Sequence, residues 1–77
     1  MSPTDAMILL RAMSDERATS ADVVGLLRSQ PKIVAEIINH ANTSYTFATK
    51  VRSLEQAVPL LGLQKVKALA MEVIRRS

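Results

Sequence analysis

Hydrophobic residues recur at helical spacing along most of the chain, and polar capping residues divide them into five segments. The clearest repeat covers residues 31–43, where Pro31 provides a favourable first helical residue. One side of a helical wheel drawn for this segment carries Ile33, Val34, Ile37, Ile38 and Ala41. The opposite side carries Glu36, Asn39, Asn42 and Thr43. The pattern predicts an amphipathic helix whose hydrophobic side faces a core.

A second helix start lies at Ser53, which forms the Ser-x-x-Gln pattern of a capping box with Gln56. In this motif the serine side chain accepts from the amide three residues on, and the glutamine side chain reaches back to the serine amide. The pattern predicts a helix over residues 54–61. Gly62 ends that helix, because glycine adopts the left-handed conformation without a steric penalty. Pro59 predicts a kink within the helix, since its ring crowds the carbonyl four residues earlier.

Another helix follows directly, over residues 63–75. Six of its hydrophobic residues gather on one arc of the wheel: Leu63, Val66, Leu69, Ala70, Val73 and Ile74. The residues outside that arc include Lys65, Lys67, Ala68 and Met71. We expect these four on the outer side of the helix, where they are candidates for binding a partner.

Two helices are predicted before residue 31. The first covers residues 3–13, starts at a Ser-Pro-Thr-Asp sequence and turns inward Ala6, Met7, Leu9, Leu10 and Met13. The second covers residues 21–29, is capped by Thr19 or Ser20 and turns inward Val23, Val24, Leu26 and Leu27. No alternating stretch is long enough to suggest a strand. The fold class is therefore all-α, a compact bundle of about five short helices in one domain over residues 1–77.

The two most strongly patterned segments also resemble a known family. SLEQAVPLLGL followed by QKVKALA, and upstream QPKIVAEIINHANTSY, are similar to the motifs of HDOD domains, which are bacterial signalling modules related to HD-type metal phosphohydrolases. The resemblance places family motif positions at Asn42, Tyr45, Glu55 and Gln56. It departs at Thr46, since the family often has glycine after the tyrosine. The loop over residues 43–52 is expected to wrap back over the core.

The resemblance also has implications for the extent and role of the chain. An HDOD domain is roughly twice as long or more, so the match implies its N-terminal helical portion. The hydrophobic sides of the first and fifth helices would then be available for a protein partner or a second copy. The family implies a regulatory module that acts through such contacts.

Composition narrows the remaining classes. The net charge is +3 and the pI about 9.8, which admits nucleic acid or an acidic protein as a partner, although the ten basic residues are scattered. Cysteine is absent, and no hydrophobic run approaches the length of a membrane span. We expect a cytoplasmic protein without a disulfide and without membrane insertion.

Catalysis is not expected. A metal-dependent phosphohydrolase site needs several histidines and aspartates, whereas this chain has one histidine, His40, followed by alanine. No cysteine nucleophile and no glycine-rich phosphate loop is present. The sequence therefore predicts neither a catalytic site, nor a metal, nor a cofactor.

DNA binding is the alternative function. Residues 21–29 and 31–43 have the length of a helix-turn-helix pair, although Gln30-Pro31 replaces the usual glycine turn. The second helix of the pair would present five polar side chains to a groove of the DNA: Lys32, Glu36, Asn39, His40 and Asn42. With Lys32 as the single cation among them, phosphate contacts would be few.

Overall fold

The computed structural model describes residues 2–44 and 50–76. Within these residues it contains no strand and five helices, which are α1 (Pro3–Ser14), α2 (Ser20–Leu27), α3 (Pro31–Ser44), α4 (Leu54–Leu61) and α5 (Leu63–Arg76). The predicted all-α bundle is confirmed, and each helix begins and ends within two residues of its predicted bounds.

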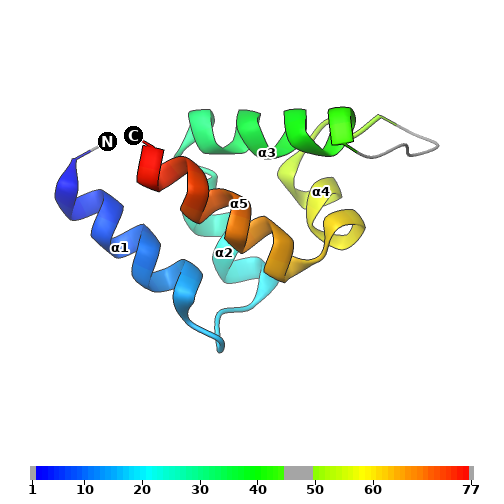
Figure 1. Cartoon of the computed structure of the whole chain (residues 1–77). Helices are drawn as coiled ribbons and strands as arrows, with labels where there is room; N and C mark the ends of the chain where they lie inside the picture. Colours follow the sequence, from blue (N-terminus) through cyan, green and yellow to red (C-terminus); the bar gives the residue numbers. More distant parts are fainter. Residues whose placement is uncertain (1, 45–49, 77) are drawn as a thin grey trace.

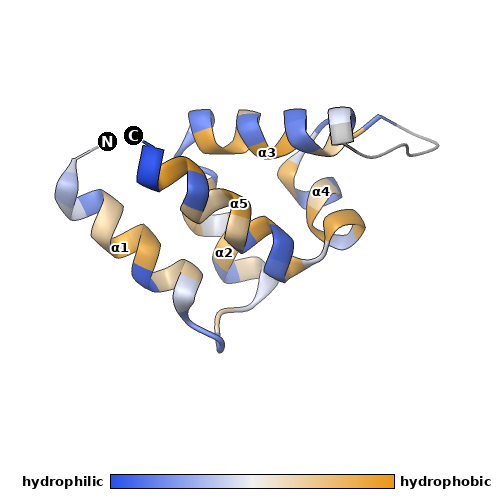
Figure 2. Ribbon diagram, viewed as in Figure 1, coloured by the Kyte–Doolittle hydropathy of each residue, from blue (hydrophilic) through white to orange (hydrophobic). Residues whose placement is uncertain are grey.

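The helix α5 lies in the middle of the bundle and packs against α1, α3 and α4, while α2 packs against α1, α3 and α4 from another side (Figure 1). Hydrophobic residues of α3 face the other helices and its hydrophilic residues face away (Figure 2). The core takes residues from all five helices and from the segment before α4. Its members are Leu9, Met13, Val23, Leu27, Ile33, Ile37, Ala41, Val51, Leu54, Ala57, Val58, Val66, Ala70, Val73 and Ile74.

Side-chain caps define the starts of α1 and α2. The Ser2 hydroxyl accepts from the Asp5 amide at 3.1 Å, as the sequence predicts. Thr19 caps α2 through a complete capping box, because its hydroxyl accepts from the Asp22 amide at 3.2 Å while the Asp22 carboxylate accepts from the Thr19 amide at 2.9 Å. Both caps satisfy amides that have no partner inside the helix.

The start of α4 follows the prediction in part. The Ser53 hydroxyl accepts from the Gln56 amide at 3.1 Å, as expected. The Gln56 side chain, however, reaches one residue further back than the capping box predicts, and its Oε1 accepts from the Arg52 amide at 2.8 Å. The helix extends past Pro59 to Leu61, and the kink at Pro59 stays a prediction.

Gly62 joins α4 directly to α5. Its φ of 93° is positive, as predicted, but its ψ of 144° is extended rather than helical. The Gly62 amide donates to the Val58 carbonyl at 2.8 Å, and the Gly62 carbonyl accepts from the Val66 amide at 3.1 Å. One residue thus ends one helix and starts the next.

Some predicted inward positions are wrong. Met7 is 66% exposed and Leu26 is 36% exposed, although both were expected in the core. Consecutive residues of a helix point about 100° apart, so four neighbouring hydrophobic residues of α1 cannot all face α5. The expectation that α1 and α5 leave their hydrophobic sides uncovered is wrong in part, because the two helices pack against each other, although Met7 and Ile8 of α1 stay exposed.

Lys67 is the largest departure from the sequence prediction. It was expected on the outer side of α5, but only 2% of it is exposed. Its Nζ donates to the carbonyl of Asp15, just after α1, at 2.9 Å. This carbonyl also accepts from the Ala18 amide at 3.1 Å, so the ammonium group adds a second, charged donor at the end of α1, where the helix dipole favours a cation.

We predict that Lys67→Ala lowers the free energy of unfolding by about 1.5–3 kcal/mol, because the Asp15 carbonyl loses a charged hydrogen-bond donor in a partly buried site. Lys65→Ala is the matched control, since Lys65 is exposed on the same helix, and a surface change of this kind costs less than about 0.5 kcal/mol. Urea unfolding followed by circular dichroism measures both values. Equal values for the two variants would show that Lys67 caps nothing.

We also predict that Ile37→Ala lowers the free energy of unfolding by about 2–5 kcal/mol, the cost of truncating a large buried side chain. Ile37 is fully buried in the middle of α3. Met7→Ala serves as the control on an exposed hydrophobic residue. An unchanged urea midpoint for Ile37→Ala would contradict the assignment of Ile37 to the core.

Candidate binding groove

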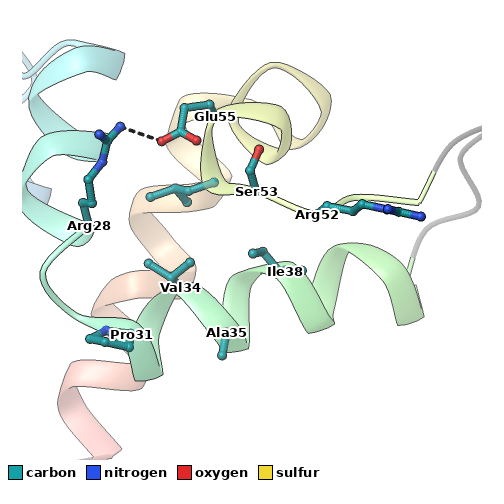
Figure 3. A pocket seen from close by; sticks show the side chains of 9 residues that line it. Arg28, Pro31, Val34, Ala35, Ile38, Arg52, Ser53 and Glu55 are labelled. Carbon is teal, nitrogen blue, oxygen red and sulfur yellow. Dashed lines mark hydrogen bonds and ion pairs between the residues drawn. The ribbon is translucent and has the colours of Figure 1, made fainter.

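A groove of about 550 Å³ lies between α3 and α4, at the C-terminal end of α2 (Figure 3). Four residues of α3 line it at positions i, i+3, i+4 and i+7: Pro31, Val34, Ala35 and Ile38. Val34 and Ile38 rise from α3 toward α4 and are half-buried, and the buried Leu54 closes the groove from the α4 side. The groove thus has a hydrophobic floor two helical turns long.

Charged side chains border this floor. Arg28, which follows α2, and Arg52, which precedes α4, lie at opposite ends of the groove (Figure 3). Arg28 Nη2 donates to Glu55 Oε1 at 2.7 Å, and the two side chains are 69% and 56% exposed. Exposed ion pairs contribute about 0–1 kcal/mol to stability, so this pair adds little to the fold.

A second hollow of about 460 Å³ lies between α2 and α4. Its hydrophobic lining consists of Ala21, Val24, Val58, Pro59 and Leu63. Glu55 lines this hollow as well as the groove. The ion pair of Glu55 with Arg28 therefore lies where the two hydrophobic hollows meet.

Two predicted motif residues hold the chain segment that borders the groove. Asn42 Nδ2 donates to the Val51 carbonyl at 2.8 Å, and Asn42 Oδ1 accepts from the Val51 amide at 2.9 Å. Gln56 accepts from the Arg52 amide, and its Nε2 donates to the Lys50 carbonyl at 3.3 Å. These bonds fix residues 50–52 between α3 and α4, so Asn42 and Gln56 position Arg52 at the groove.

The placement of Asn42 corrects the sequence prediction. Asn42 was assigned to the polar side of its helix, but it is half-buried and forms a paired backbone contact. Glu55, by contrast, is exposed at the groove. Tyr45, the remaining motif position, lies outside the described residues.

The four residues proposed for partner binding on α5 do not form one surface. Lys65 and Ala68 are exposed, and their binding role stays a prediction. Lys67 is buried, as described above. Met71 is half-buried beside α1, where the Ser14 hydroxyl donates to its sulfur at 3.7 Å. None of the four lines the groove between α3 and α4.

Sequence reasoning missed Arg28 and Arg52 as groove residues. Both belong to the scattered set of ten cations, and neither was placed beside residues 31–43. No helical wheel could reveal them, because each lies at the edge of a helix and the groove exists only where three helices meet. Of the four residues of α3 that line the groove, Val34 and Ile38 were assigned to the core, and Pro31 and Ala35 were not assigned to either side.

Some of the side chains proposed for reading DNA form hydrogen bonds within the chain. Glu36 Oε2 accepts from Arg76 Nη2 of α5 at 3.1 Å, and Asn42 holds Val51. Lys32 and Asn39 are exposed on α3. The face that the DNA-binding alternative requires is therefore shared with contacts inside the chain.

Acidic side chains are dispersed rather than clustered. Among residues 2–44 and 50–76, no three histidine, cysteine, aspartate or glutamate side chains come close enough to hold a metal ion. The Arg17 amide donates to the Asp15 carboxylate at 2.9 Å and holds the pKa of Asp15 below its ordinary value, with a further contribution from the Arg17 guanidinium. This carboxylate lies at the end of α1 and does not line the groove.

Comparison with known proteins gives one match. The family model of the HDOD domain matches residues 1–77, the whole length of the chain. No curated protein and no solved structure matches the chain. For the described part of the chain, none of the helices combines the length and the hydrophobicity that crossing a membrane requires.

We predict that Asn42→Ala lowers the free energy of unfolding by about 1–3 kcal/mol, because two hydrogen bonds are lost and the Val51 backbone groups lose their partner. The Val51 amide should also exchange with solvent faster in hydrogen-exchange measurements. Asn39→Ala, an exposed site one turn earlier, provides the control. Unchanged exchange at Val51 would argue against this role of Asn42.

Proposed function

This chain belongs to the HDOD domain family, which is associated with signalling, and from that membership we propose that it is a regulatory module that binds protein segments. In this proposal the groove between α3 and α4 is the binding surface. We also propose that the chain acts by contact rather than by catalysis. A cytoplasmic location fits this role, because a protein without cysteine does not depend on an oxidising compartment.

The observation that carries the proposal is the hydrophobic floor of the groove. Val34 and Ile38 pack against the core and are only half-buried, whereas Ile33 and Ile37 on the same helix are almost fully buried. Grooves of this kind, with a hydrophobic floor and a charged border, accept segments of other proteins. The groove thus offers hydrophobic surface that folding has not used.

A binding role rather than catalysis is supported by the residues available for chemistry. The chain contains one histidine and no cysteine, and the groove itself contributes one titratable acid, Glu55. That acid is paired with Arg28 and is exposed, so it is not held in the buried setting that tunes a catalytic carboxyl group.

DNA binding remains the second candidate from the sequence, and it gains no support from the arrangement of α3. Glu36 and Asn42, both candidates for reading a base, are committed to contacts within the chain. The exposed cation of that face is Lys32, and one phosphate contact provides little affinity for a duplex. We therefore favour protein binding.

A photo-cross-linking residue in place of Ala35 tests the proposal directly. Ala35 is exposed and lines the groove, and Glu72, exposed on α5, is the matched control position. In living cells we expect a discrete protein adduct from position 35 and none from position 72. The mass of the adduct then shows whether it is a second copy or another protein, and light scattering of the purified chain shows whether the chain associates with itself.

Identification of the adduct by mass spectrometry should be followed by calorimetry with the purified partner and the unmodified chain. Measurable binding that is lost in Val34→Asp, with helical content retained, is the expected result. Adducts that form equally from both positions, or no binding in calorimetry, would contradict the groove as the functional surface.

A further inference from the structure

We propose that the occupant of the groove is an acidic amphipathic helix of another protein, and that a carboxylate of this helix replaces Glu55 on Arg28. This inference rests on the proposed function and specifies its partner. It follows from the spacing of the hydrophobic floor, the charges at its border and the charge distribution of the chain itself.

The hydrophobic floor fits a helix. Pro31 and Ile38 lie seven residues apart on α3, so the floor is about 10 Å long at the helical rise of 1.5 Å per residue. Two turns of a partner helix cover that length and present hydrophobic residues at i, i+3, i+4 and i+7. The second hollow, lined by Val24 and Leu63 among others, extends the hydrophobic surface beyond Glu55.

The border of the groove favours an acidic partner. Two guanidinium groups, Arg28 and Arg52, line it against one carboxylate, Glu55. Two further cations near these residues in sequence are exposed, namely Lys32, which follows Pro31, and Lys50, which lies two residues before Arg52. Arginine recognises carboxylates with paired hydrogen bonds. Because both arginines are exposed, a partner carboxylate loses little hydration when it binds them.

Glu55 already forms with Arg28 the carboxylate–guanidinium ion pair that we propose for the partner. Its carboxylate lies 2.7 Å from Arg28 Nη2, at the place where the two hydrophobic hollows meet. An exposed pair of this kind is weak, so a carboxylate on a bound helix can exchange with it at small cost. Glu55 then moves aside, and the two hollows form one continuous surface.

The partner is a different protein rather than a second copy. Each of the five helices in the described part of the chain carries a single acidic residue, namely Asp5, Asp22, Glu36, Glu55 or Glu72. The chain carries a net charge of +3. None of these described helices is therefore an acidic helix that could complement the groove. A small ligand fits less well, because the bordering side chains are largely exposed and small-molecule pockets enclose most of their ligand.

A designed peptide tests the inference. The probe is a fluorescein-labelled helix of about four turns with leucine at i, i+3, i+4 and i+7 and glutamate beside the leucines, and its control has lysine in place of every glutamate. Fluorescence anisotropy at about 0.15 M salt limits long-range attraction. We expect the glutamate peptide to bind at least about tenfold more tightly than the lysine peptide.

Two pairs of variants locate the binding. Arg28→Gln should weaken binding of the glutamate peptide about tenfold, whereas Arg17→Gln makes the same charge change at a 93% exposed side chain outside the groove and should change it little. Glu55→Gln should tighten binding about two- to fivefold, the equivalent of one weak exposed ion pair, and Glu72→Gln is its control. Circular dichroism verifies that each variant folds. If Arg28→Gln does not fold, Arg52→Gln takes its place.

The outcomes separate the inference from the proposed function. Equal effects within each pair of variants would show that only net charge attracts the peptide and would overturn the inference. Equal binding of the two peptides, or binding of the lysine peptide alone, would also overturn it. A specific adduct from position 35 would still support protein binding in those cases, and an adduct identified as a second copy of this chain would refute the acidic partner.

Discussion

Burial of α5 is the constraint on which the rest of this small domain depends. A chain of 77 residues can build only a modest core, so its central helix has to contact several others. Val66 and Ala70 of α5 are completely buried, and Ala41 of α3 and Ala57 of α4 are completely buried as well. The three alanines, Ala41, Ala57 and Ala70, allow the helix backbones to approach closely, because larger side chains would separate them. The bundle is therefore held by close contact of α1, α3 and α4 with one helix.

Polar contacts at the ends of the helices complete this arrangement. Lys67 binds the carbonyl that follows α1, and Asn42 pairs with both backbone groups of Val51 before α4. The Asn42 contact pairs the amide and carbonyl of Val51, which lies outside the helices, and the Lys67 contact adds a charged donor to a carbonyl that the Ala18 amide also binds. They also determine where the connecting segments lie. The position of Arg52, and with it one end of the groove, follows from the contacts of Asn42 and Gln56.

The candidate binding surface is a consequence of how three helices meet. The hydrophobic residues of α3 spread over an arc wider than the core can cover, so Ile33 and Ile37 are buried while Val34 and Ile38 remain half-exposed. The C-terminal end of α2 and the start of α4 add charged residues at either end of this uncovered strip. A weak ion pair divides it from the neighbouring hollow. Membership of a signalling-associated family is in line with our proposal that this surface binds a protein segment.

The sequence by itself determined the helices, their bounds and most of their caps, because these depend on residues within four positions of one another. It also carried the family motifs. Only the tertiary structure decided that Lys67 is buried, that Asn42 faces inward and that Met7 faces outward. A helical wheel shows which residues share a side of a helix, but it does not show how much of that side another helix covers. Arg28 and Glu55 form one site for the same reason, since packing of α2 against α4 brings together two residues that lie 27 positions apart.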